Sequence, residues 1–184
     1  QQKAVATVIG ASVGRQTNLF DNTPINPHFS WEEAREMKES GFVDIQSHSF
    51  DLHHPGTSPG TGRGAAPLPL ESEEEYIERF TTDTLNNHHY IEDNLPHHRV
   101  ALYAYPYGIY NEWSETVLKQ LGYVATLTIE SGVNEIKDGF HLLKRVNMAE
   151  YESSSDAFAD ILRMIGAEEI VPDADESNPS LHGS

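Results

Sequence analysis

Residues 31–48 read WEEAREMKESGFVDIQSH, a helix-forming run followed directly by a run that alternates like a strand. Ser30 precedes the first run and Glu33 lies three positions later, which is the spacing of a capping box at a helix N-terminus. Gly41 suits the position just after a helix, where glycine accepts a left-handed backbone. The stretch therefore predicts a helix that leads through a tight turn into a strand over residues 42–48.

The same alternation of elements extends in both directions from this stretch. Strands are predicted at 3–10, 100–108, 122–129 and 141–148, and helices from Ser72, at 111–121, and after a cap at Ser154 or Ser155. Residues 54–70 are rich in Gly and Pro and predict an exposed, irregular loop. Strands that alternate with helices favour an α/β fold with a mostly parallel sheet. In such folds the chemistry gathers where the strands end.

The composition excludes several classes of partner. The 184 residues carry 12 basic and 29 acidic side chains, and this net charge of −17 repels nucleic acid and anionic lipid. The sequence has no apolar run of about 18 residues, so no transmembrane segment is predicted. It also has no cysteine, so a bound metal must be held by histidine, carboxylate or water.

A histidine-rich stretch, SHSFDLHH at residues 47–54, follows the strand that ends near His48. His48 and His53 are five positions apart, and neither a helix nor a strand would aim both side chains at one ion. The chain must therefore turn between them if they bind a metal together. Asp44 shares the strand face of His48 but lies about 13 Å along the strand, which is too far for a common ion. From spacing alone, the stretch is either a metal site or a polar loop.

The run VDIQSHSFDLHH, followed after a long helix by YAYPYG, resembles the polysaccharide deacetylase family, also called carbohydrate esterase family 4. The spacing of the two histidines and the form AYPYG look most like the branch that acts on poly-N-acetylglucosamine. The resemblance covers about residues 3–166 and implies a distorted or incomplete (β/α) barrel. It implies a domain at 1–166, and the acidic segment at 167–184 predicts a disordered tail.

The resemblance also implies an activity and a site. A divalent metal, usually zinc, activates a water and polarises the acetamide carbonyl of the substrate. His48 and His53 match the two metal-binding histidines, while cobalt, nickel and iron suit the same ligands. Tyr105, Pro106 and Tyr107 match a loop that lines the substrate groove. The backbone N–H of Tyr107 matches a donor of the oxyanion hole.

This sequence departs from the family pattern at two further motifs. The Asp-Asp motif, which supplies the catalytic base and the third metal ligand, is absent, and we expect it upstream of residue 1 in a longer protein. The family ends with a Leu-x-His motif whose histidine is the general acid, but this chain has Leu143-Lys144-Arg145. His141 is a weak substitute because of its position along the strand. Arg145 either forms a charge pair in the groove or is structural.

Three functions therefore remain open. The first is a metal-dependent hydrolase that removes N-acetyl groups from N-acetylglucosamine-containing exopolysaccharide or peptidoglycan, at an extracellular or cell-surface location that the resemblance alone implies. The second is a non-catalytic carbohydrate-binding or scaffold domain, because the catalytic aspartates are missing. The third is another hydrolase with the same histidines, although a Gly-x-Ser-x-Gly nucleophile motif is absent from the sequence.

Overall fold

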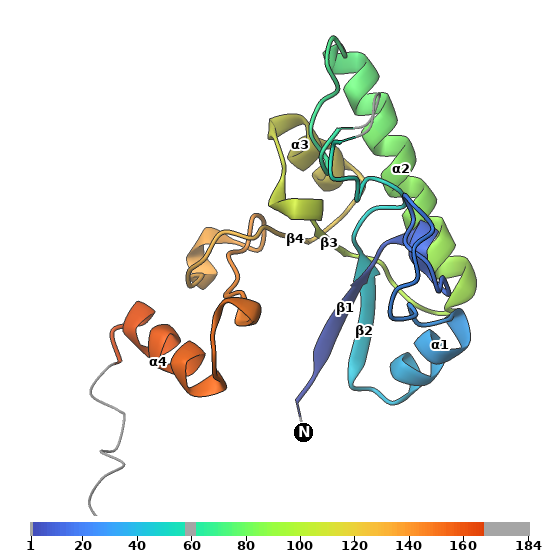
Figure 1. Cartoon of the computed structure of the whole chain (residues 1–184). Coiled ribbons are helices and arrows are strands. Elements are labelled where there is room, and N and C mark those ends of the chain that lie inside the picture. The colour runs from blue at the N-terminus through green and yellow to red at the C-terminus, as the bar shows by residue number, and fades with distance from the viewer. Residues whose placement is uncertain (1, 58–61, 168–184) are drawn as a thin grey trace, which may run out of the picture. The chain divides into compact units, whose positions relative to one another are not determined.

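The computed structural model describes residues 2–57 and 62–167. Its centre is a parallel sheet with the strand order β1-β2-β3-β4, shown in Figure 1. The strands are β1 (Ala4–Val8), β2 (Val43–Ser47), β3 (Leu102–Ala104) and β4 (Ala125–Leu127). The predicted α/β class is confirmed, and the sheet of the described residues stays open between β1 and β4.

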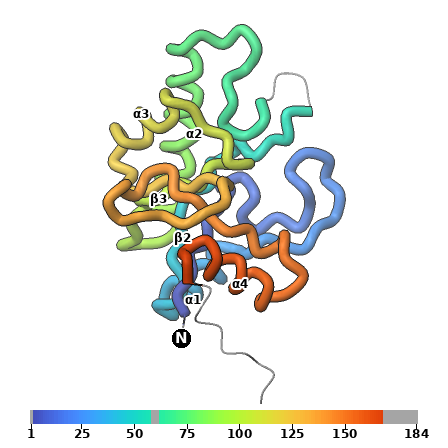
Figure 2. Tube along the Cα trace, turned by 90° about the vertical axis from the view of Figure 1, so that its left-hand side faces the viewer, coloured from blue at the N-terminus to red at the C-terminus, as the bar shows by residue number. Residues whose placement is uncertain are grey.

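The helices follow the strands in the predicted order, with α2 packed against β2 and α3. They are α1 (Trp31–Glu39), α2 (Glu73–Asn94), α3 (Glu112–Gln120) and α4 (Ser154–Met164), with short 3-10 helices η1 (Gly10–Ser12), η2 (Pro106–Gly108), η3 (Ile136–Asp138) and η4 (Met148–Glu150). The capping box that begins α1 is confirmed, since Glu33 N donates to Ser30 Oγ and Ser30 N donates to Glu33. Figure 2 shows the chain between η1 and α1 as a wide loop.

Two boundaries differ from the sequence prediction. The strand expected at 141–148 is reduced, in the described chain, to one parallel bridge between Leu127 and Leu143. Leu142 has a φ of 58°, and this left-handed residue interrupts an extended chain. The cap of α4 is Ser153, not Ser154 or Ser155, because the Ser153 hydroxyl accepts from the N–H of Asp156 at 3.2 Å.

The loop at 54–70 was expected to be exposed, and part of it is not. Ala65 is fully buried, and its carbonyl accepts a hydrogen bond from the Tyr76 hydroxyl at 2.9 Å. Arg79 also donates to the carbonyl of Ala66 at 3.1 Å. Polar side chains of α2 therefore hold the end of this loop against the helix, a contact that its Gly- and Pro-rich composition did not predict.

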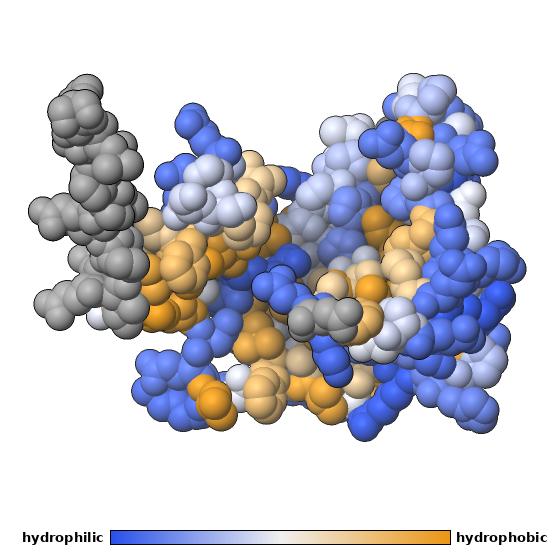
Figure 3. All heavy atoms as spheres, turned by 90° about the horizontal axis from the view of Figure 1, so that it is seen from below, coloured by the Kyte–Doolittle hydropathy of each residue, from blue (hydrophilic) through white to orange (hydrophobic). Residues whose placement is uncertain are grey.

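The core lies between α2 and the sheet, and the buried face of α2 is not apolar throughout. Tyr76, Phe80 and Ile91 are fully buried, as their spacing predicts. The middle of the same face instead buries three polar side chains, Asp83, Thr84 and Asn87. Elsewhere apolar side chains stay exposed, and Figure 3 shows apolar surface on the face seen from below.

The chain divides into two compact units, residues 1–145 and 146–184. The first contains the sheet and α1 to α3, and the second contains η4 and α4. Apart from Ala167, the predicted acidic tail at 167–184 lies outside the described residues and stays a prediction. In the described part of the chain, none of the helices combines the length and apolarity needed to cross a membrane.

Candidate active site

The carboxyl end of β2 carries the two histidines of the candidate site. The N–H of His48 still bonds to the carbonyl of Val8 at 2.9 Å, as a strand residue would. The next residue, Ser49, has a φ of 82° and turns the chain back. The ring centroids of His48 and His53 consequently lie 5.1 Å apart, so the loop brings together two side chains that no regular element could.

The ring of His48 is oriented by the neighbouring strand. Its Nδ1 lies 2.6 Å from the carbonyl oxygen of Ala104, which can only accept, so Nδ1 carries the proton and Nε2 keeps a lone pair. Burial lowers the pKa of His48 to about 4. Burial also lowers the pKa of His53, and the nearby His54 adds to this effect. Both rings are therefore neutral near pH 7, which is the form that binds metals.

The loop after β3 covers the second histidine. The Tyr107 ring packs on the His53 ring with centroids 4.4 Å apart, and its hydroxyl donates to the carbonyl of His53 at 3.3 Å. Tyr107 has a φ of 55°, a left-handed conformation that is uncommon for a tyrosine. The guanidinium of Arg63 lies 5.0 Å from the centre of the same ring. Tyr107 therefore joins the histidine loop to the segment around Arg63.

The other two residues of the expected groove lie deeper. Tyr105 is fully buried, and its hydroxyl donates to Glu115 at 2.8 Å. Pro106 is also buried. As the structure stands, Tyr107 is the member of this trio with exposed surface, and the groove-lining role of Tyr105 and Pro106 stays a prediction.

Two basic side chains considered from the sequence occupy different surroundings. Arg145 donates from Nε to the carbonyl of Thr128 at 2.5 Å, and its charge contributes to the lowered pKa of His48. No carboxylate among the described residues forms an ion pair with it. His141 instead lies 3.2 Å from the buried carboxylate of Glu115 on α3. Both alternatives for Arg145, charge pair and structural residue, remain predictions.

A third ligand does not accompany the two histidines in the described residues. No group of three His, Asp or Glu side chains there could hold a metal ion. Asp51 pairs with His54 at 3.5 Å, and the distant Asp44 pairs with His98 at 3.8 Å. The donors present, two neutral imidazoles with one fixed by a carbonyl, fit a divalent metal as part of its ligand set.

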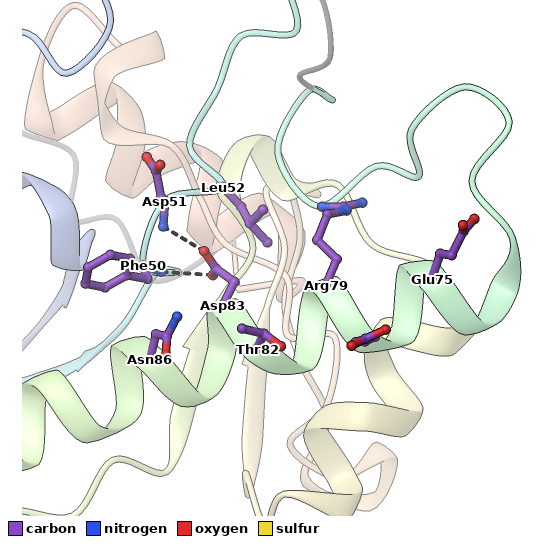
Figure 4. Close-up of a pocket in the computed structure, with 9 residues that line it drawn as sticks. Phe50, Asp51, Leu52, Glu75, Arg79, Thr82, Asp83 and Asn86 are labelled. Carbon is purple, nitrogen blue, oxygen red and sulfur yellow. Dashed lines mark hydrogen bonds between the residues drawn. The ribbon is translucent and has the colours of Figure 1, made fainter.

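Two residues beneath the loop were not found from the sequence. Asp83 on α2 accepts from the N–H of Phe50 at 2.9 Å and of Asp51 at 2.7 Å, as Figure 4 shows. Asn87, one turn later, donates to Ser47 Oγ at 2.8 Å and to the carbonyl of Val8 at 3.1 Å. Their signal in the sequence is faint: polar residues interrupt the apolar face that Tyr76, Phe80 and Ile91 define.

Comparison with known proteins identifies the relatives of this chain. The family model described as "Polysaccharide deacetylase" matches residues 1–126. The poly-β-1,6-N-acetyl-D-glucosamine N-deacetylase of Escherichia coli K12 is 26% identical over 146 residues, which is 70% of this chain and 21% of that protein. The protein of the same name from Staphylococcus epidermidis is 27% identical over 135 residues, 73% of this chain and 41% of that one. The chain thus spans less than half the length of these relatives.

Solved structures with the same fold include the deacetylase domain of BpsB from Bordetella bronchiseptica, with a TM-score of 0.67, 24% identity, and coverage of 78% of this chain and 60% of that one. IcaB from Ammonifex degensii gives a TM-score of 0.65 and 21% identity over 89% of this chain and 60% of that one. The open parallel sheet corresponds to part of the (β/α) barrel expected from the sequence. Since the family model covers more than half of the sequence, the chain belongs to the polysaccharide deacetylase family.

Proposed function

We propose that this chain forms part of a metal-dependent de-N-acetylase that acts on a polysaccharide containing N-acetylglucosamine. The observation that carries the proposal is the pair of neutral histidine rings, 5.1 Å apart at the end of β2, in a chain of the polysaccharide deacetylase family. The names of the relatives from E. coli and S. epidermidis support poly-β-1,6-N-acetylglucosamine as the substrate.

His48 and His53 hold the metal in this proposal, and carboxylates outside the described residues complete its ligands and supply the general base. Zinc is the expected ion, with cobalt, nickel or iron as alternatives. When bound, a divalent metal activates a water and polarises the acetamide carbonyl. The carbonyl of Ala104 fixes the tautomer of His48, so that Nε2 is the ligating atom.

The reaction adds the water oxygen to the acetamide carbon, breaks the C–N bond, and releases acetate and a protonated amine. Negative charge develops on the carbonyl oxygen and needs a fixed donor. The N–H of Tyr107 is suited to this role, because Gly108 and Ile109 make the hydrogen bonds of the turn while Tyr107 N–H has no acceptor in the described structure. The acidic chain also suits a cationic, deacetylated product. Such a polysaccharide implies an extracellular or cell-surface location.

A non-catalytic carbohydrate-binding domain is the alternative. The observation that favours it is the absence of a third metal-ligating side chain from the described part of the chain. The two functions differ in what happens to an N-acetylglucosamine oligomer, since a binding domain would retain it without releasing acetate.

The metal claim is tested by measuring bound zinc after dialysis of wild type, His48→Ala and His53→Ala. We expect both variants to lose the metal, because each removes one of the two histidine ligands. His89→Ala is the matched control, since His89 is an exposed histidine on α2. If both loop variants keep the zinc content of the control, the assignment is wrong.

The enzymatic claim is tested by acetate release from N-acetylglucosamine oligomers, with zinc, cobalt or nickel added. The assay uses this chain and a longer protein that carries it together with its flanking sequence. Release that disappears in His48→Ala supports the hydrolase. Oligomer binding without release, across all three metals and both proteins, favours the binding domain.

A further inference from the structure

The carboxylate of Asp83 reaches from α2 to the loop that separates the two histidines. Its two oxygens each accept one backbone hydrogen bond, from Phe50 N at 2.9 Å and from Asp51 N at 2.7 Å. These amides lie midway between His48 and His53, at the point where the chain reverses. Figure 4 shows Asp83 pointing from the helix toward this segment.

Only a carboxylate offers two acceptor oxygens at this position. An asparagine would keep one acceptor and would turn its NH₂ group toward the second backbone N–H, so one of the two bonds would be lost. Asp83 is 9% exposed, and its oxygens face the loop amides. It also borders a cleft of about 530 Å³, but both oxygens are already used by the loop and do not need a ligand.

The basic side chain that lines the same cleft, Arg79, is already bonded to other groups. Arg79, one turn before Asp83, donates to Glu71 at 2.6 and 2.8 Å and to the carbonyl of Ala66. Asp83 forms no ion pair with the described residues. A buried carboxylate without an ion-pair partner lowers stability unless its hydrogen bonds are made, so the two loop amides are what keep it here.

Besides Asp83, the 3-10 helix η1 also holds the backbone of the histidine loop. The carbonyls of Ser49 and Phe50 accept from Gly10 N at 3.1 Å and Ala11 N at 3.0 Å in η1. A side-chain carbon on Gly10 would overlap Asn87 and Phe50, so the three segments are in close contact. Phe50 is thus held on its C=O side by η1 and on its N–H side by Asp83. These two contacts stabilise the left-handed conformation of Ser49. That conformation is unfavourable by itself and persists where the surrounding structure holds it.

We propose that Asp83 is a positioning residue that fixes the reversal between His48 and His53 and thereby sets the metal-binding geometry of their rings. The inference rests on the proposed function, because it assigns the two rings to one ion. Asp83 does not touch that ion in the proposal. It acts through the backbone of residues 50 and 51, as outer partners of metal ligands commonly do.

The test compares Asp83→Asn with two controls on the same helix. Asp93→Asn makes the same chemical change at an exposed position, and Ile91→Val lowers stability at a buried core position eight residues after Asp83. Zinc affinity is measured by calorimetry on the folded proteins. We expect Asp83→Asn to bind zinc at least about tenfold more weakly than wild type, and both controls to stay within about twofold.

A second readout does not depend on metal. In the metal-free wild type, the amides of Phe50 and Asp51 should exchange slowly with solvent, and a nuclear Overhauser effect should join the rings of His48 and His53. Asp83→Asn should speed the exchange and weaken the ring contact. Fast exchange at both amides in the wild type would overturn the proposal without any variant.

The outcomes separate the two proposals. If wild type binds zinc and Asp83→Asn binds it as tightly as Asp93→Asn does, the positioning role is wrong while the metal site stands. An equal loss of affinity in Ile91→Val also overturns it, since affinity would then follow stability alone. If wild type binds no zinc even within the longer protein that carries its flanking sequence, the proposed function fails, and an unchanged ring contact in Asp83→Asn would remove the positioning role as well.

Discussion

The ends and the middle of α2 bury the same face of one helix with opposite kinds of side chain. Tyr76, Phe80 and Ile91 fill the core at the ends. In the middle, Asn87 bonds to the carbonyl of Val8 on β1 and to the hydroxyl of Ser47 on β2, and Asp83 bonds to the backbone of the loop that follows β2. Apolar packing is non-directional, but a hydrogen bond fixes its partner in one place. One helix therefore both stabilises the domain and orders its candidate site.

The largest expected effect comes from an apolar side chain on the buried face of α2. Phe80→Ala removes a fully buried ring that packs near Tyr76 and Tyr103, at centroid distances of 5.9 and 5.8 Å. The transfer and cavity costs predict a loss of about 3–5 kcal/mol in the free energy of unfolding, measured in urea. Phe140→Ala, at a residue 57% exposed, should change it by less than about 1 kcal/mol. Equal effects would mean that Phe80 is not a core residue.

The next effect is a dependence of stability on pH, which comes from Asp83 in the polar middle of α2. Burial raises the pKa of Asp83 to about 6, against an ordinary value of 3.8, so the folded state binds the proton more tightly than the unfolded state. The stabilising contribution of Asp83 is therefore complete below about pH 4 and is lost as the pH rises through 6. About two pKa units correspond to roughly 3 kcal/mol.

This pH dependence is isolated by a difference between two proteins. Unfolding of metal-free wild type and Asp83→Asn is followed from pH 4 to 7, and wild type should lose stability relative to the variant as the pH rises. Asp93→Asn should run parallel to wild type because Asp93 is exposed. A constant difference between wild type and Asp83→Asn would show that the carboxyl does not titrate in this range.

Local sequence signals explain which parts of this arrangement could be predicted. The start of α1 follows from Ser30 and Glu33, three residues apart. The turn between His48 and His53 was expected from their spacing on the condition that both bind one metal. Both depend on neighbours in the chain. Tertiary contacts decide the remainder, as at residues 141–148, where an extended pattern yields one bridge because Leu142 is left-handed.

The contact between Asp83 and the loop is a tertiary contact, which local sequence signals do not predict. It joins residues 32 and 33 positions apart, and an aspartate inside a helix is ordinarily exposed. The His98 side chain is a similar case, since it is 5% exposed and its ring reaches the carbonyl of Ile45 on β2, 53 residues away in the sequence. A polar residue on an otherwise apolar face can be noticed in the sequence, but its partner cannot.

A smaller effect is expected from the second polar residue of the middle. Asn87→Ala removes both hydrogen bonds of the side chain and leaves Ser47 Oγ and the carbonyl of Val8 buried without this donor. The expected loss is about 2 kcal/mol, measured by urea unfolding. Asn86→Ala changes an exposed neighbour on the same helix and should be nearly neutral. An equal, small loss in both variants would mean that the two bonds of Asn87 contribute no net stability.

The smallest effect is expected at the N-terminus of α2. The hydroxyl of Ser72 accepts from Glu75 N at 3.2 Å, and Ser72→Ala should cost about 1 kcal/mol of stability. Because the cap supports the helix and does not touch the loop, zinc affinity should stay within about twofold of wild type. A loss of affinity as large as that of Asp83→Asn would mean that any weakening of α2 disturbs the histidines. An unchanged affinity, beside a weakened one in Asp83→Asn, would separate helix stability from loop positioning within a single element.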